Sequence, residues 1–137
     1  MHQAELTAFA KRYATAWSSQ NPASLAAFYA EDGSLTVNSG APSVGRAAIT
    51  ATAKGFMAAF PDMAVKLKEV GQEGPHAIFR WIWTGTNSGP GGTGKQVRIE
   101  GYEEWTFGAN GLIASSDGHY DEAEYARQLQ VGAPPAP

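Results

Sequence analysis

Carboxylates gather in one stretch of the chain, residues 95–121, whose remaining residues are typical of two strands joined by a tight turn. They are Glu100, Glu103, Glu104, Asp117 and Asp121. The sequence GANG at residues 108–111 predicts the turn, because Asn-Gly accommodates positive φ. Charged groups are unusual inside strands unless one face meets water or lines a cavity. These acids are therefore either solvated charges on the sheet or groups that do chemistry in a pocket.

The first of the two strands points to an acid in an apolar pocket. Side chains alternate between the faces of a strand, so Glu103 shares a face with Trp105 and Phe107. Burial beside two aromatic rings disfavours the charged form of a carboxyl and raises its pKa.

The second strand, residues 112–120, offers two faces, and the sequence alone leaves open which one points inward. One face carries Asp117, His119 and Asp121, and the other carries Ser116, Gly118 and Tyr120. Asp121 also stands directly before a predicted helix, with Glu124 three residues further on, which is the pattern of a capping box. Asp121 is thus either an acid of the site or a helix cap.

Helices come before most of the strands. The hydrophobic periodicity predicts helices at residues 3–18, 23–29 and 46–60, strands at 34–37, 63–70, 76–86, 97–107 and 112–120, and a short helix after Asp121. This order favours an α+β fold in which a curved, mainly antiparallel sheet forms a cone around three N-terminal helices. The mouth of such a cone suits a small apolar ligand. Residues 1–130 are predicted to be one domain, and the Pro-rich residues 131–137 a disordered tail.

Composition excludes several classes of function. The chain has 137 residues and no cysteine, so it has no disulfide framework and no thiolate nucleophile. A net charge of -3 without a basic run argues against nucleic acid as a partner, and no apolar run reaches membrane-spanning length. The glycine-rich loop at residues 87–94 lacks the Lys-Ser/Thr ending of a phosphate-binding loop. We expect a cytoplasmic protein that binds neither membrane nor nucleic acid and uses no metal or cofactor.

Several short motifs agree with one known family. FAKRYATAW, FYAEDGSLTV, GRAAI, FPD, WTGT, the glycine-rich loop, ANGLI and YDEAEYARQL follow one another between residues 3 and 130. In this order they resemble the nuclear-transport-factor-2-like superfamily, especially its SnoaL-like polyketide cyclase and ketosteroid isomerase-like branches. The resemblance implies a cystatin-like cone, a fold that carries isomerases, cyclases, dehydratases, epoxide hydrolases and binding proteins.

The isomerase branch implies two hydrogen-bond donors for an oxyanion. Tyr13, in RYATAW, matches its tyrosine on the first helix, and Glu103 matches its carboxylic acid that stays protonated. The catalytic Asp of that branch follows the first strand, where this chain has Val37 and Asn38. An amide takes up no proton at neutral pH, which disfavours the isomerase reaction itself.

The cyclase branch implies an Asp with a His two residues before it in the last strand. His119 and Asp121 have that spacing. Counting from Gly111 instead places the two family positions at Ser116 and Gly118, and a β-bulge would reconcile the two alignments.

Two hypotheses about function follow. In the first, the chain is a cofactor-free enzyme in which Asp121, oriented by His119, removes a proton next to a carbonyl group, with Asp117 as the alternative base. Tyr13 and Glu103 then donate to the developing oxyanion. The residues expected to line the ligand pocket are Trp17, Phe28, Asn38, Phe56, Phe60, Arg80, Ile82, Trp105, Ser116 and Tyr120.

In the second hypothesis, the chain is a small-molecule-binding homodimer without chemistry, since it lacks a carboxylate at Asn38 and Gly118. Both hypotheses predict a homodimer through the sheet, with Trp81 and Trp83 on the face away from the helices. Arg80 lies on the other face of the same strand, and its candidate partner is Glu103, because a buried charge requires a counter-charge.

Overall fold

One six-stranded sheet carries the fold, and the computed structural model describes it through residues 1–135. The helices are α1 (Gln3–Trp17), α2 (Pro22–Ala26), α3 (Arg46–Ala59) and α4 (Glu122–Val131). The strands are β1 (Tyr29–Val37), β2 (Ser43–Val44), β3 (Ala64–Glu73), β4 (His76–Thr86), β5 (Gln96–Phe107) and β6 (Ile113–His119). They are ordered β2-β1-β6-β5-β4-β3, and all neighbours are antiparallel except β1 and β6.

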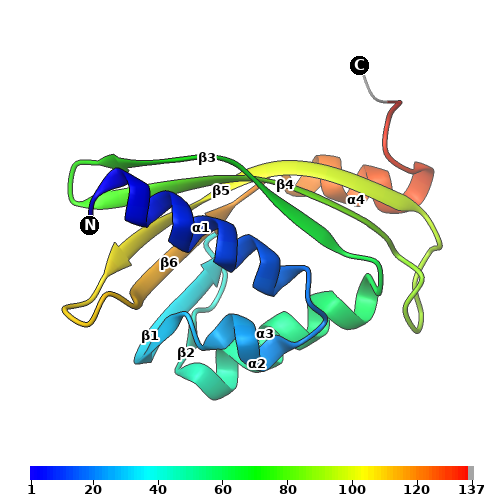
Figure 1. Ribbon diagram of the computed structural model, residues 1–137. Helices are drawn as coiled ribbons and strands as arrows, with labels where there is room; N and C mark the ends of the chain where they lie inside the picture. Colours follow the sequence, from blue (N-terminus) through cyan, green and yellow to red (C-terminus); the bar gives the residue numbers. More distant parts are fainter. Residues whose placement is uncertain (136–137) are drawn as a thin grey trace.

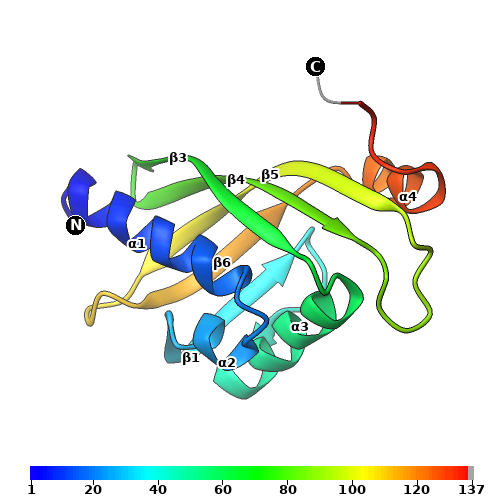
Figure 2. The ribbon, with the colours of Figure 1, turned by 45° about the vertical axis from the view of Figure 1, so that its right-hand side comes forward.

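The sheet curves over the first three helices. α1 runs beneath β3 to β5, α2 and α3 close the space below it, and α4 lies at the end of the molecule opposite the N-terminus (Figures 1 and 2). This arrangement confirms the predicted α+β class and the curved sheet around N-terminal helices. No helix among the described residues has the length and apolar character needed to cross a membrane.

The first helix packs through the stripe that its sequence predicts. Leu6, Phe9, Tyr13 and Trp17 recur at spacings of three and four residues, and all four are buried. The next helix, α2, starts with Pro22, and the Asn21 side chain caps it by accepting a hydrogen bond from the Ser24 amide at 3.3 Å.

The first strand begins earlier than predicted. The periodicity extends a helix to residue 29 and starts the strand at 34, whereas β1 starts at Tyr29. The pairing of β1 with β6 shifts register between Tyr29 and Ser34. Gly33 stands in this irregularity, where a Cβ atom would come within 2.8 Å of the Ile113 carbonyl oxygen. The irregular backbone hides the alternation by which a strand is recognised.

The predicted dimer interface, formed by Trp81 and Trp83, is not on the surface of the sheet. They are only 8% and 5% exposed, and the Trp83 ring lies 5.8 Å from Phe56 and 5.0 Å from Phe60. Both tryptophans therefore face the helices, not away from them as predicted. Alternation fixes which residues of β4 share a face, but large apolar side chains stand on both faces, so the pattern does not tell which face is inside.

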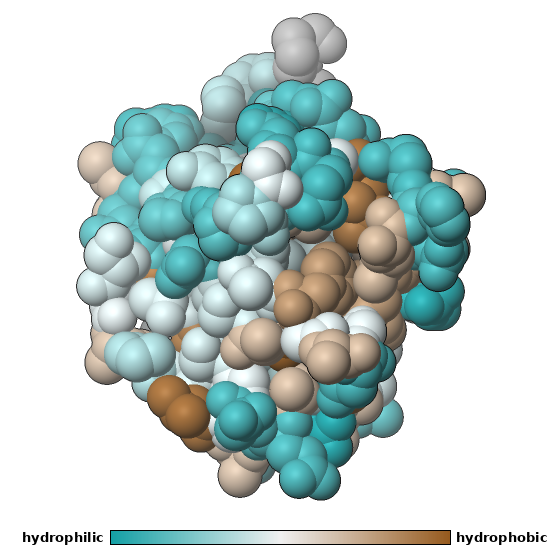
Figure 3. Space-filling view, turned by 90° about the vertical axis from the view of Figure 1, so that its left-hand side faces the viewer, coloured by the Kyte–Doolittle hydropathy of each residue, from teal (hydrophilic) through white to brown (hydrophobic). Residues whose placement is uncertain are grey.

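The face of the sheet turned away from the helices carries several charged pairs. Lys68 pairs with Glu100 at 2.6 Å, and His76 lies 3.4 Å from Glu104. The end of the molecule that carries the N-terminus is largely hydrophilic, with hydrophobic side chains gathered to the right of its centre and again at the lower left of the view (Figure 3).

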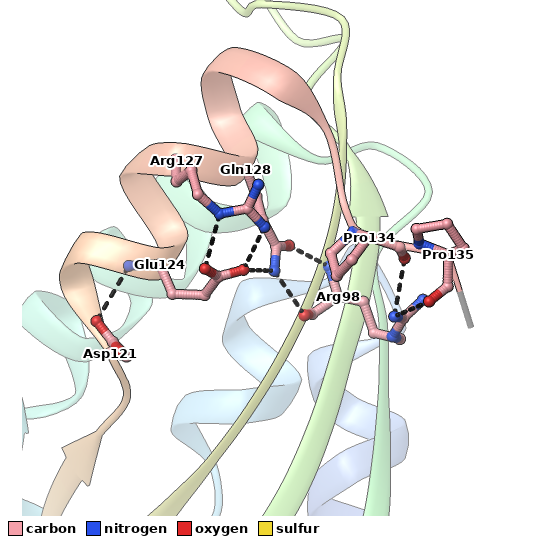
Figure 4. A network of polar contacts seen from close by, with 7 residues as sticks. All are labelled: Arg98, Asp121, Glu124, Arg127, Gln128, Pro134 and Pro135. Atoms are coloured by element: carbon pink, nitrogen blue, oxygen red, sulfur yellow. Dashed lines mark hydrogen bonds and ion pairs between the residues drawn. The ribbon is translucent and has the colours of Figure 1, made fainter. Parts of the chain in front are cut away.

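The last helix is fastened to β5 through a buried amide. Gln128 accepts a hydrogen bond from the Arg98 backbone N–H at 2.7 Å and donates one to the Arg98 carbonyl at 3.1 Å (Figure 4). Glu124 accepts from both Arg127 and Gln128, so the exposed side of α4 and its buried amide belong to one network.

The residues after α4 continue along β5. The Ala133 amide donates to the Gln96 carbonyl at 2.7 Å, and the Arg98 guanidinium donates to the Pro134 carbonyl at 2.9 Å. Hydrogen bonds thus hold residues 131–135, where the sequence predicts a disordered tail. Residues 136 and 137 lie outside the described residues.

Candidate functional site

An open cavity lies between α1, α3 and the sheet. The cavity, together with the open space at its mouth, measures about 550 Å³. Its aromatic walls are Trp17, Phe56, Trp81, Trp83 and Tyr120. Its aliphatic walls are Leu35, Val37, Met63 and Val65. Glu103 and Gly118 complete the lining, so Glu103 is its one carboxyl group among the described residues.

The aromatic walls stand nearly at right angles to one another. The planes of Trp17 and Phe56 meet at 80°, those of Phe56 and Trp83 at 89°, and those of Trp83 and Tyr120 at 74°. Trp81 continues the series at 65° to Tyr120. Consecutive ring centroids are 5.8 to 6.2 Å apart. The five rings thus pack edge to face on one another while lining the cavity, and they are called the aromatic box below.

Gly101 leaves the space that the Trp81 ring occupies. Gly101 on β5 pairs with Trp81 on β4, and a Cβ atom at Gly101 would lie 2.6 Å from the Trp81 ring. The indole thus lies across the backbone of β5, in space that a side chain would occupy.

Glu103 is held by one oxygen and leaves the other free. Its Oε1 accepts hydrogen bonds from the Tyr13 hydroxyl at 2.7 Å, the Ser116 hydroxyl at 2.7 Å and the Trp105 indole N–H at 3.0 Å. No hydrogen bond from residues 1–135 reaches Oε2, although Glu103 is only 7% exposed and lines the cavity. The donors fix the orientation of the carboxyl, and Oε2 remains available to a ligand.

Burial sets the protonation behaviour of this carboxyl. Burial raises the pKa of Glu103, and the hydrogen bonds from Ser116, Tyr13 and Trp105 offset part of that effect. A carboxyl with a raised pKa exchanges its proton closer to neutral pH than a solvated one, as an acid–base group must.

Two buried tyrosines stand behind Glu103. The Tyr13 hydroxyl donates to Glu103, and its oxygen accepts from the Tyr29 hydroxyl at 2.7 Å. Burial, and secondly the charge of Glu103, raise the pKa of both tyrosines well above the usual value, so both keep their protons. Tyr13 does not line the cavity. It therefore donates to Glu103, whereas the sequence predicted a donor to the oxyanion of a ligand.

Tyr120 is positioned by Asn38. Asn38 has a left-handed φ of 48°, and its Oδ1 accepts from the Tyr120 backbone N–H at 2.9 Å. Its own backbone N–H donates to the Gly118 carbonyl at 2.8 Å. Asn38 thus joins the ends of β1 and β6. Contrary to the prediction, it does not line the cavity. Burial, followed by nearby Tyr125 and Glu122, raises the pKa of Tyr120 to about 12, so its hydroxyl keeps its proton at neutral pH and can donate it in a hydrogen bond.

The structure does not bring the predicted base and its partner to the cavity. His119 points to the outer face of β6, where its ring lies 5.0 Å from that of Tyr102. Asp121 is exposed and caps α4, accepting from the Glu124 amide at 3.0 Å. Asp117 is exposed on the same outer face as His119. Beside Glu103, the residues of β6 that point inward are Ser116 and Gly118.

Apart from Asn38, the predicted pocket residues divide into four groups. Trp17, Phe56 and Tyr120 line the cavity as predicted. Trp105 and Ser116 donate hydrogen bonds to Glu103 instead. Phe60 belongs to the hydrophobic core, and Phe28 packs against that core. Arg80 and Ile82 lie on the outer face, and Arg80 pairs with Glu73 at 3.4 Å and Glu69 at 3.6 Å, not with Glu103.

The main residues missed by the sequence are Trp81, Trp83 and Gly118. A signal for them lies in the pairing of neighbouring strands, since Glu103 stands opposite Phe79 on β4 and Gly118 on β6. If Glu103 points inward, then Phe79, Trp81 and Trp83 on β4 point inward as well, because they lie on the same face of the sheet. That register links distant parts of the chain and is not readable from one strand.

The part of the chain that the structure describes contains no cluster of metal ligands. There, no group of three or more His, Asp or Glu side chains lies close enough to hold a metal ion.

Comparison with known proteins extends the description. The sequence model of the SnoaL-like domain family matches residues 10–116. Comparison with curated proteins gives no significant match.

Solved structures share the fold at low identity. A protein with a ketosteroid isomerase-like fold from Catenulispora acidiphila, in complex with trimethylamine, is 20% identical with a TM-score of 0.77, over 88% of this chain and 91% of that one. A protein assigned to the SnoaL-like polyketide cyclases, from Jannaschia sp. CCS1, is 18% identical with a TM-score of 0.76, over 97% and 93%. A cystatin-fold protein from Novosphingobium aromaticivorans is 15% identical with a TM-score of 0.68, over 87% and 98%.

Proposed function

The chain belongs to the SnoaL-like domain family within the nuclear-transport-factor-2-like superfamily, and on this premise we propose that it binds a small hydrophobic carbonyl compound and moves a proton on it without a cofactor. Glu103 is the group that moves the proton. The observation that supports this proposal is the asymmetry of its carboxyl, with three donors on Oε1 and none from the described residues on Oε2.

The proposed step is the removal of a proton from the carbon next to the carbonyl group. The C–H bond breaks, its proton goes to Oε2 of Glu103, and the electron pair moves to the carbonyl oxygen as an enolate forms. Tyr120, whose hydroxyl keeps its proton at neutral pH, supplies a donor for that oxygen. Return of the proton to the same or another carbon completes an exchange or an isomerisation. Because the base is the ionised form, the rate rises with pH through the pKa of Glu103.

Deuterium exchange tests the proposal without knowledge of the natural substrate. Simple hydrophobic ketones and enones are incubated with the protein in D₂O, and loss of the signal from the hydrogens next to the carbonyl is followed by NMR. Glu103→Gln should lower the exchange rate by about 10²-fold or more. Glu100→Gln is the matched control, since Glu100 is an exposed acid of the same strand that pairs with Lys68. Equal rates in Glu103→Gln and the wild type would exclude Glu103 as the base.

A non-catalytic binding protein is the second candidate. It is favoured by the position of Asp121 outside the cavity, which leaves Glu103 as the one carboxyl of the lining in residues 1–135. A ligand at a hundred times its dissociation constant adds about 2.7 kcal/mol to stability, which a thermal-shift screen detects. Ligands that bind equally well to Glu103→Gln and exchange no hydrogen would favour this candidate.

The homodimer proposed for either candidate needs a surface other than the one predicted. Trp81 and Trp83 line the cavity and are buried within the chain. Light scattering at micromolar concentration measures the oligomeric state, and a monomer under these conditions would contradict the proposal of a dimer.

A further inference from the structure

We infer that the cavity selects a compact organic cation, an alkylammonium group, held by the aromatic box and by the carboxylate of Glu103. This inference names the charge of the ligand at the proposed site. It rests on the cavity of the proposed function but not on proton transfer.

The first argument is the arrangement of the rings. Each aromatic face carries a partial negative charge from its quadrupole, and a cation within about 6 Å of a ring centroid is attracted to it. Trp17, Phe56, Trp83, Tyr120 and Trp81 line one cavity, with consecutive planes at 65° to 89°. A flat ligand is stacked best by parallel rings, whereas perpendicular walls suit a rounded group such as a methylated ammonium.

The second argument is the charge balance of the lining. Glu103 supplies the one acidic group, and no Lys, Arg or His side chain of residues 1–135 lines the cavity. Arg80 is engaged on the outer face by Glu69 and Glu73. A ligand with a negative charge would meet the carboxylate without a compensating cation, while a positive one supplies the counter-charge that a buried carboxylate requires.

The third argument concerns the groups that face Glu103. Tyr13 from α1, Tyr29 behind it on β1 and Ser116 from β6 are neutral hydroxyl groups, and Trp105 on β5 is a neutral indole. Tyr120 shares the cavity and stays neutral at physiological pH. No cation of the described residues faces this carboxyl, and burial raises its pKa. A bound cation reverses that effect, so binding near this pKa releases a proton.

An isosteric pair of probes tests the inference. Choline and 3,3-dimethyl-1-butanol have nearly the same shape, but only choline carries the charge. Titration calorimetry should show choline binding about tenfold more tightly or better at pH 8. Its affinity should rise with pH through the pKa of Glu103 and then level off, whereas the affinity of the alcohol should stay flat.

Two variants assign the effect to the two parts of the site. Glu103→Gln should abolish the pH dependence and most of the preference for choline, and Glu100→Gln should change neither. Phe56→Leu replaces a half-buried ring with an aliphatic group, so it should weaken choline binding and spare the alcohol.

Equal affinities of the two probes, or a choline preference that survives Glu103→Gln unchanged, would overturn the inference. If neither probe binds while ketones undergo exchange, the charge assignment fails and the proposed function stands. If neither the probes nor the ketones interact with the protein, the cavity is not a ligand site and both fail together.

Discussion

Tyr13→Phe isolates the support that Glu103 receives from the core. The substitution keeps the ring and its packing against Phe79 and Trp105, whose centroids lie 5.5 and 5.0 Å away. It removes only the hydroxyl, which donates to Glu103 and accepts from Tyr29, both at 2.7 Å.

The expected cost follows from these two hydrogen bonds. A hydrogen bond to a charged group contributes about 1.5–3 kcal/mol, and the bond from Tyr29 about 1 kcal/mol more. We therefore expect Tyr13→Phe to lower the free energy of unfolding by about 2–4 kcal/mol above the pKa of Glu103. At roughly 3 °C per kcal/mol for a chain of this size, Tm falls by about 6–12 °C.

The cost should depend on pH with a definite sign. Tyr13 donates to the carboxylate and so lowers the pKa of Glu103, against the larger effect of burial. Without that donor the pKa of Glu103 in the folded state rises further. The loss of stability is then smaller when Glu103 is protonated in both proteins and grows as the pH rises through the wild-type pKa.

Urea unfolding at several pH values measures this dependence. Tyr29→Phe is the matched control, because it removes only the outer hydroxyl of the chain and should cost about 1 kcal/mol. Tyr102→Phe, at a side chain 38% exposed, should stay within about 0.5 kcal/mol of the wild type. A Tyr13→Phe cost no larger than that of Tyr102→Phe, or one that shrinks as the pH rises, would refute the reasoning.

Three further predictions concern Glu103, the cap of α4 and the buried amide. Burial raises the pKa of Glu103 above its usual 4.5, so the stability it contributes is complete below that value and is lost as pH rises through the folded-state pKa. Glu103→Gln should thus become more stable relative to the wild type as the pH rises through this window. The gain is about 1.4 kcal/mol for each pH unit between the unfolded-state and folded-state pKa of Glu103. Unfolding experiments from pH 4 to 9 measure it, and a stability difference between variant and wild type that does not change with pH would contradict the prediction. Asp121→Ala should cost about 1 kcal/mol through loss of the cap, with unchanged ketone exchange, and a loss of exchange would restore Asp121 as a catalytic candidate. Gln128→Leu should cost about 2–4 kcal/mol by chemical denaturation, because it strands the buried N–H and C=O of Arg98, and a cost below about 1 kcal/mol would show that water replaces the amide.

Local patterns predicted the residues whose neighbours lie on the same element. Glu103 was found because it alternates with Trp105 on β5, and both are buried side by side. The apolar stripe of α1 places Tyr13 in the core, and the resemblance to the isomerase branch gives it a part in the site. In each case one period, of two or of 3.6 residues, determines the face.

The residues that were predicted wrongly depend on how neighbouring strands pair. The choice between Asp121 and Gly118 depends on how β6 pairs with β5, where Glu103 stands opposite Gly118. The orientation of Trp81 follows from the same sheet, through its pairing with Gly101. These contacts join residues far apart in the sequence, and no local period records them. Asp121 also met the helix-cap pattern, which proved to be its structural role.

The amide of Gln128 has a consequence beyond fastening α4. β6 pairs with β5 only from Tyr102 onward, so on that side the first half of β5 has no neighbouring strand among residues 1–135. Its N–H and C=O groups at Arg98 would form an open edge, able to capture an extended segment of another chain. The Gln128 side-chain amide forms the two hydrogen bonds with Arg98 that a neighbouring strand would otherwise form. The Ala133 backbone N–H adds a hydrogen bond to the Gln96 carbonyl. The C-terminal segment thus guards the molecule against strand-to-strand association.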